Sequence, residues 1–113
     1  MSHDNGLTEH AIQSQILDYL KAKRIFHWRN NSGAMKSSYG GKSRFMHFGA
    51  VGSPDIFVVV KGKIVGFEVK GQGKYPSEAQ VHFGDSLTKA GGFYYVVRSL
   101  DEVTNILGRL GII

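Results

Sequence analysis

The order of the predicted helices and strands indicates an α/β fold, a sandwich in which helices flank a central mixed β-sheet. Two observations carry this prediction. Apolar residues recur every three to four positions in three separate segments, which is typical of helices buried along one side. Between them lie short segments that are continuously apolar or alternate between apolar and polar residues, as strands do. The predicted order is helix, three or four strands, helix, strand and C-terminal helix.

The first helix is expected to follow Thr8, a good N-cap residue, and to run to about Ala22. Its positions Glu9 and Gln13 project onto the apolar stripe of the helix, which is an unusual direction for a solvated carboxylate. The apolar residues of this stripe are Ile12, Ile16, Tyr19 and Leu20.

A short strand is expected over residues 24–29, where apolar and polar residues alternate, with Trp28 in the core. Residues 30–52 are rich in glycine, serine and basic residues. Most of this segment is expected to be a loop, with a short strand around residues 45–48, and a loop of this length is usually functional or disordered.

The clearest strands are residues 55–60 and 63–70, because Lys61-Gly62 between them is typical of a tight hairpin turn. A further strand over residues 93–97 is apolar throughout, which predicts a central position in the sheet.

Two more helices are expected, and each begins with the spacing of a capping box. The second helix has Ser77 and Gln80 at its start, ends at Gly91-Gly92, and has an apolar side of Val81, Phe83 and Leu87. The last helix begins with Ser99 and Glu102, and its inward residues are Val103, Ile106, Leu107 and Leu110.

Length and composition narrow the class of protein. A chain of 113 residues is the size of one domain, and the absence of cysteine excludes disulfides, thiolate metal sites and cysteine nucleophiles. The longest apolar run is far too short to cross a bilayer, and residues 1–6 lack the pattern of a signal peptide. A cytoplasmic location is therefore expected.

The charge is basic and unevenly distributed. Lysine and arginine outnumber aspartate and glutamate by 14 to 9, and no acidic residue lies between Tyr19 and Pro54, where seven lysines and arginines fall. Such a stretch is typical of a protein that binds a polyanion, nucleic acid above all. The alternative is a solvated basic surface without a partner.

Two carboxylates stand out because they lie in the strands that should form the core of the sheet. Asp55 follows Gly52-Ser53-Pro54 at the start of one strand, and Glu68 lies two residues before Lys70 in the next. Strand alternation places Glu68 and Lys70 on one face, and the hairpin brings Asp55 to the same end. Two neighbouring buried carboxylates repel each other, and Mg²⁺ or Mn²⁺ would resolve this repulsion. The alternative is an ordinary Glu68–Lys70 ion pair on an exposed face.

This constellation resembles the PD-(D/E)xK nuclease superfamily and, more narrowly, the VRR-NUC (virus-type replication-repair nuclease) family. The matching segments are, in order, Thr8-Glu9, Arg29-Asn30-Asn31-Ser32-Gly33, Gly52-Ser53-Pro54-Asp55, Glu68-Val69-Lys70 and Gln80. The resemblance covers nearly the whole chain and implies one nuclease domain over residues 1–113, of the stand-alone phage or bacterial type. It also implies a restriction-endonuclease-like core in αβββαβ order, followed by a C-terminal helix.

The resemblance implies a role for each matching residue. Asp55 and Glu68 correspond to metal-binding carboxylates, with the backbone carbonyl of Val69 as a further ligand of Mg²⁺ or Mn²⁺. Lys70 corresponds to the lysine that positions the attacking water. Glu9 and Gln80 correspond to further catalytic positions; the alternatives are that Glu9 only favours its helix N-terminus and that Gln80 only completes the cap with Ser77.

The function that the resemblance implies is a metal-dependent, structure-specific DNA endonuclease that resolves four-way (Holliday) junctions. Symmetric cutting of such a junction needs two active sites, so a homodimer is expected. The alternatives are a flap or broad-specificity DNA nuclease, a catalytically silent DNA-binding module, and a small RNA-binding or phage accessory protein. Candidate contacts to nucleic acid are Arg29, Asn31, Ser32, Lys36, Tyr39, Lys42, Arg44 and Lys74.

Overall fold

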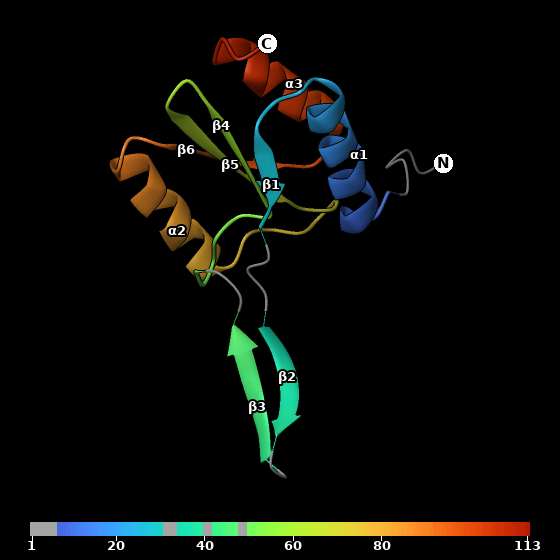
Figure 1. Cartoon of the computed structure of the whole chain (residues 1–113), viewed down its shortest axis with the longest axis vertical. Coiled ribbons are helices and arrows are strands. Elements are labelled where there is room, and N and C mark those ends of the chain that lie inside the picture. The colour runs from blue at the N-terminus through green and yellow to red at the C-terminus, as the bar shows by residue number, and fades with distance from the viewer. Residues whose placement is uncertain (1–6, 31–33, 40–41, 48–49) are drawn as a thin grey trace.

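The computed structural model describes residues 7–30, 34–39, 42–47 and 50–113, and it confirms an α/β fold with a mixed sheet between helices (Figure 1). The helices are α1 (Glu9–Ala22), α2 (Glu78–Lys89) and α3 (Leu100–Arg109). The strands are β1 (His27–Arg29), β2 (Ala34–Tyr39), β3 (Lys42–His47), β4 (Ile56–Val60), β5 (Lys63–Val69) and β6 (Phe93–Val97). No helix in these described ranges is long and apolar enough to span a membrane.

The main sheet has four strands in the order β1-β4-β5-β6, in which only β5 and β6 pair in parallel. The prediction that residues 93–97 form a central strand is wrong, because β6 lies at an edge. Its apolar sequence has another cause: α2 contacts it from one side of the sheet and α3 from the other. A parallel strand at the edge of a sheet is apolar when helices cover both of its faces.

The hairpin between β4 and β5 has the predicted two-residue turn. Lys61 and Gly62 both have positive φ, 50° and 82°, as the type I′ turn requires, and Val60 pairs with Lys63 beside it. The register that this turn sets places Ile56 opposite Phe67.

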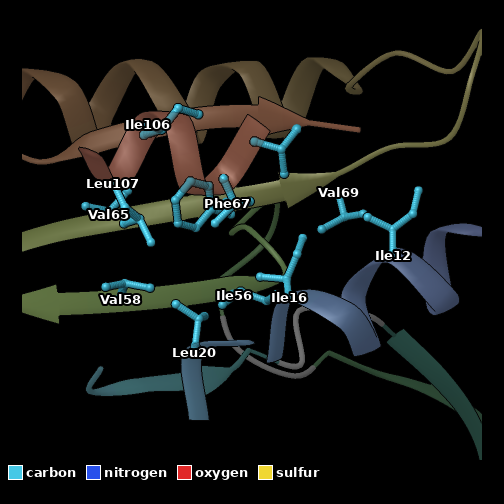
Figure 2. Packing of buried hydrophobic residues seen from close by; sticks show 12 residues of the cluster. Ile12, Ile16, Leu20, Ile56, Val58, Val65, Phe67, Val69, Ile106 and Leu107 are labelled. Carbon is cyan, nitrogen blue, oxygen red and sulfur yellow. The ribbon is translucent and has the colours of Figure 1, made fainter. Parts of the chain in front are cut away.

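The hydrophobic core of the molecule packs against one face of the main sheet, here called the core face (Figure 2). The predicted stripe of α1 is confirmed, since its three aliphatic residues are buried and Tyr19 is half-buried; α3 buries its inward residues except the half-buried Leu110. The cluster comprises Ile12, Ile16, Leu20, Ile56, Val58, Val65, Phe67, Val69, Val97, Val103, Ile106 and Leu107.

The opposite face, the α2 face, is covered by a single helix that sits close to the strands. A Cβ atom on Gly66 would meet Pro54, Phe57 and Leu87, and one on Gly84 would meet the ring of Tyr94. The predicted apolar side of α2 is wrong at Val81, which is 47% exposed. Gly84 is the buried residue of this helix, because the ring of Tyr94 takes the space that a side chain would fill.

The strand predicted over residues 24–29 is shorter than expected and begins only at His27. Arg24 has a positive φ of 57°, and the Ile25 N–H donates to the Leu20 carbonyl, so these residues close the end of α1 instead of extending the sheet. Trp28 is not a core residue: it is 40% exposed, because β1 is an edge strand and, among the described helices, the one that contacts it is α1 on the core face.

Residues 30–52 were expected to be mostly loop with a short strand around residues 45–48. The described part of that strand lies in β3, and the structure adds a second strand, β2, that pairs with it antiparallel, with Tyr39 opposite Lys42. The hairpin is a separate two-stranded sheet that extends away from the main sheet (Figure 1). Neither strand has the composition of a strong strand former, so mutual pairing and not local propensity defines them.

The helix caps follow the predicted spacing with one difference. Ser77 and Gln80 form a complete capping box at α2. At α3, Ser99 accepts from the Glu102 N–H as expected, but the Glu102 carboxylate accepts from the Arg98 N–H at 2.7 Å, one residue before the cap. The carboxylate therefore also fixes the end of β6 to the start of α3.

Candidate active site

The two predicted carboxylates lie side by side on the α2 face, where β4 begins and β5 ends. Because Ile56 pairs with Phe67, Asp55 lies opposite Glu68. The Val69 N–H donates to Asp55 Oδ2 at 2.7 Å and holds the aspartate against β5. Asp55 lies just before β4 and Lys70 just after β5, so the two predicted strands are one residue shorter at this end.

Glu68 is buried, with only 3% of the residue exposed. Its Oε2 atom lies 3.2 Å from Lys70 Nζ and accepts from Gln80 Nε2 at 2.9 Å. Glu68 and Lys70 are in contact, but the alternative prediction that they form an ordinary ion pair on an exposed face is wrong, because Glu68 is buried. The other oxygen, Glu68 Oε1, is buried without a hydrogen-bond partner among the described residues, which is costly for a carboxylate.

The surroundings raise the pKa of both carboxyl groups, Asp55 and Glu68. Burial raises the pKa of Glu68 from 4.5 to about 7; the negative charge of Asp55 adds to this rise, and Lys70 opposes it. Burial also raises the pKa of Asp55, against the lowering effects of the Val69 N–H and the Lys70 charge. Neighbouring buried acids with raised pKa values are typical of a site that gains a cation or does chemistry.

Glu9, at the first turn of α1, reaches the same end of the sheet. Its Oε2 atom accepts from the Gly71 N–H at 3.1 Å, just beyond Lys70. Its negative charge contributes to the raised pKa of Asp55. Glu9 thus does more than favour its own helix N-terminus, since it borders the carboxylate pair.

Gln80 combines the two alternatives that its sequence position allowed. Its Oε1 atom accepts from the Ser77 N–H at 2.8 Å and completes the capping box, while its Nε2 atom donates to Glu68. The helix cap therefore fixes the orientation of the amide that contacts the carboxylate.

Asn30 holds the loop before Asp55. Its segment, residues 29–33, is one of those that resemble the VRR-NUC family, but the residue types did not reveal this contact. Its side chain donates to Ser53 Oγ at 2.7 Å and to the Pro54 carbonyl at 3.0 Å, and its N–H donates to the Asp55 carbonyl at 2.7 Å. Gly52 in this loop has a φ of 81° and touches the first turn of α2, where a side chain would collide with the Ala79 carbonyl. These contacts fix where Asp55 begins β4.

Two further side chains near the site, those of Tyr94 and Arg98, were not predicted from the sequence. Tyr94, paired with Gly66, has a buried hydroxyl without a partner among the described residues; burial and the charges of Glu68 and Asp55 raise its pKa to about 12. Arg98 donates from Nη1 to the Gly71 carbonyl at 2.6 Å and lies over the Tyr75 ring. The signal for both was their position in and after the strand parallel to β5.

The predicted nucleic-acid contacts are dispersed. Arg29 and Lys74 are exposed. Asn31 and Ser32 lie outside the described residues. Lys36 and Tyr39 in β2 and Lys42 and Arg44 in β3 are placed by backbone and register only, with Ser37 opposite Arg44 and Tyr39 opposite Lys42.

The donor set fits a hard divalent cation. Over the described ranges no three or more His, Cys, Asp and Glu side chains lie together in a group that could hold a metal ion. The acidic side chains available to a cation at this site are therefore the Asp55–Glu68 pair. The unpartnered, buried Glu68 Oε1 is an oxygen ready for a cation, and a cation would relieve the raised pKa values of both acids. Mg²⁺ is commonly held by one or two carboxylates together with water and substrate phosphates.

Comparison with solved structures finds a chain described as "VRR_NUC domain". It aligns with 90% of this chain and 97% of its own length, at a TM-score of 0.61 and 23% sequence identity. No family model and no curated protein sequence matches this chain. The fold expected from the motifs is therefore confirmed: this chain has the fold of a VRR_NUC domain, and the carboxylate pair lies within it.

Proposed function

We propose that this chain is a nuclease that hydrolyses phosphodiester bonds in DNA with the help of Mg²⁺ or Mn²⁺. The observation that carries the proposal is the buried Asp55–Glu68 pair, with Glu68 Oε1 unpartnered and Lys70 beside it. The fold shared with a VRR_NUC domain supports it. Residues 1–113 are proposed to form one such domain.

In this proposal Asp55, Glu68 and the Val69 carbonyl hold the cation. When bound, a divalent cation lowers the pKa of a water molecule and stabilises negative charge on the phosphate. Lys70, 14% exposed and held 3.2 Å from Glu68 Oε2, orients the water and the phosphate from the same face. Gln80 keeps Glu68 in its rotamer, and Glu9 holds the backbone after Lys70 through the Gly71 N–H.

DNA is the proposed substrate because the chain carries a charge of +5 and its basic residues gather in the segment between Tyr19 and Pro54. Within that segment the β2–β3 hairpin extends away from the main sheet, which suits an element that contacts nucleic acid outside the site (Figure 1). We propose contacts from Arg29, Asn31, Ser32, Lys36, Tyr39, Lys42, Arg44 and Lys74. The preferred DNA is proposed to be a four-way junction, cut by a homodimer.

The experiment is cleavage of a labelled four-way junction beside matched duplex, flap and single strand, each with Mg²⁺, Mn²⁺ or EDTA. Wild type is compared with Asp55→Ala and with Lys70→Ala. Metal-dependent cutting that both substitutions abolish, while DNA binding is retained, is the expected result. Preference for the junction, together with a dimer mass in solution, would support the resolvase.

Other outcomes separate the alternatives. Equal cutting of all four DNAs would indicate a nuclease of broad specificity, and preference for the flap would indicate a flap nuclease. DNA binding without cleavage under either metal would contradict the enzyme and leave a DNA-binding module. A monomer at working concentration would count against symmetric junction resolution.

A further inference from the structure

Four aromatic side chains form a continuous row, here called the aromatic row, from α2 to the edge of the sheet: Phe83, Phe57, Trp28 and Phe26. The ring centroids are 6.4 Å apart between Phe83 and Phe57, 5.2 Å between Phe57 and Trp28, and 6.0 Å between Trp28 and Phe26. At the inner end the rings pack under α2, and Phe57 is buried.

The outer end of the row is open. Phe26 is 69% exposed and Trp28 is 40% exposed. In the described part of the chain α2 packs on β6, at the opposite edge of the sheet (Figure 1), and the helix that contacts β1 is α1, which lies on the core face. Single exposed apolar residues are ordinary on a protein surface, but adjoining exposed rings mark a binding surface.

The open end of the row leads to the candidate active site. Trp28 pairs with Phe57, and Phe57 shares its face with Asp55 by strand alternation. Two residues beyond Trp28, the Asn30 N–H donates to the Asp55 carbonyl at 2.7 Å. The exposed rings and the carboxylate pair therefore lie on one face of the sheet, joined by β1.

The charges around the row favour a polyanion over a second copy of this chain. Arg24 precedes Phe26 in the chain, Lys61 follows the strand that pairs with β1, and both are exposed. Arg29 is also exposed at this edge of the sheet, although strand alternation places it on the other face from Trp28. A symmetric contact between two copies of this surface would bring like charges together, whereas phosphates would neutralise them. Aromatic rings beside cations are the arrangement that binds single-stranded nucleic acid, because every base can stack on a ring.

We propose that Phe26 and Trp28 form a stacking platform for unpaired bases of a DNA strand that runs along β1 to the Asp55–Glu68 site. The inference rests on the proposed function for the direction of the strand, but not for the stacking itself. Such a platform would favour branched DNA, in which bases at the branch point can unstack, over continuous duplex.

The test uses Trp28 as its own reporter, since it is the only tryptophan in the chain. The full-length protein in EDTA is titrated with oligothymidylate and with a blunt duplex of equal length. Tryptophan emission is followed beside the anisotropy of a labelled strand. We expect the single strand to quench the emission with the same midpoint as the anisotropy change, and the duplex to leave the emission unchanged.

Two variants and a control sharpen the test. Phe26→Ala, which changes a largely exposed ring, and Trp28→Ala, followed by anisotropy, should each weaken single-strand binding about tenfold. Ile113→Ala removes a comparably exposed apolar side chain at the C-terminus and should leave binding unchanged. Thermal melting of each variant checks that it is folded.

Several outcomes would overturn the platform. One is single-strand binding without quenching, and another is equal affinity in wild type, Phe26→Ala and Trp28→Ala. A concentration-dependent shift of emission with a dimer mass, both lost in Phe26→Ala, would show that a second copy covers the row. These results are distinct from failure of the proposed function, because binding is measured without metal and cleavage loss in Asp55→Ala does not depend on the row.

Discussion

The two faces of the four-stranded sheet are built from the same strands and differ in almost every other respect. On the core face, Phe67 is fully buried among aliphatic side chains from α1 and α3. On the α2 face, its neighbour Glu68 is also buried, but it lies beside the Asp55 carboxylate and Lys70. Two buried oxygens on this face, Glu68 Oε1 and the Tyr94 hydroxyl, lack partners among the described residues.

The comparison teaches how so short a chain accommodates both a core and a polar site. Strand alternation lets β5 contribute Val65, Phe67 and Val69 to the core while Glu68 and Lys70 stay on the other side. The core face supplies the free energy of folding, and the α2 face holds groups that are costly in the absence of a ligand. Residues of the core and residues of the carboxylate site should therefore respond oppositely to substitution.

The largest expected effect separates Phe67 from Glu68. Phe67→Ala should lower the free energy of unfolding by about 3–5 kcal/mol, because it leaves a cavity in a fully buried cluster. Glu68→Gln should leave stability near pH 7.5 unchanged or raised, yet reduce metal-dependent cleavage about 1,000-fold or more, because a metal-binding oxygen is lost. Urea unfolding and single-turnover cleavage measure the two quantities.

A matched pair tests whether the separation is general. Val65→Ala and Lys70→Ala lie on opposite faces of the same strand region, and the first should lose stability while the second loses cleavage. If Glu68→Gln unfolded the protein as readily as Phe67→Ala, the α2 face would be structural and the contrast between the faces would fail.

The next effect concerns how closely α2 approaches the sheet. Gly84→Ala should lower the free energy of unfolding by about 1–3 kcal/mol, because the new Cβ would lie 2.5 Å from Tyr94 Cδ2. Ala normally favours a helix over Gly by about 1 kcal/mol, so the sign of the change is diagnostic. Gly108→Ala in α3, where a Cβ meets nothing, is the control and should not destabilise. A stabilised Gly84→Ala variant would show that α2 is not held against Tyr94.

A smaller effect follows from pH. The pKa of Glu68 is raised by burial from 4.5 to about 7, so the folded protein holds this proton more tightly than the unfolded chain. Stability in EDTA should therefore fall as pH rises from about 4.5 to about 7, by at most about 3 kcal/mol and by less where solvent screens the carboxylate. Chemical unfolding across this range measures it, and the difference between wild type and Glu68→Gln isolates this group from the histidines. Parallel curves for the two proteins would contradict the prediction.

The smallest effect is expected at Tyr94. Its buried hydroxyl lacks a partner among the described residues, so Tyr94→Phe should keep or raise stability by less than about 1 kcal/mol. Tyr95→Phe, on the core face beside Phe67, is the matched control and also changes one hydroxyl. A loss of more than about 1 kcal/mol in Tyr94→Phe alone, in thermal or urea unfolding, would show that the hydroxyl has a partner after all, such as an ordered water.

Local signals in the sequence predicted the helices and the central hairpin well. Thr8, Ser77 and Ser99 each cap a helix as expected, and Lys61-Gly62 sets the turn that fixes the register of β4 and β5. Caps and two-residue turns depend on neighbours in the chain, so residue types suffice to predict them. With the register fixed, alternation alone places Glu68 opposite Asp55 and apart from Phe67.

The sequence did not predict features that depend on which segments meet in space. A strand was expected around residues 45–48, within β3, but not β2, which is a strand because it pairs with β3. β6 is an edge strand although its residues are as apolar as those of a central one. Trp28 is exposed because, among the described helices, the one that contacts β1 is α1, which lies on the core face. Tyr94 lies near the carboxylates because the parallel pairing of β6 with β5 brings it there. By itself, the sequence determined the helix boundaries, the hairpin register and the carboxylates and lysine of the candidate site. Only the tertiary structure decided which faces are covered and which polar atoms are left without partners, since burial depends on what packs from elsewhere in the chain.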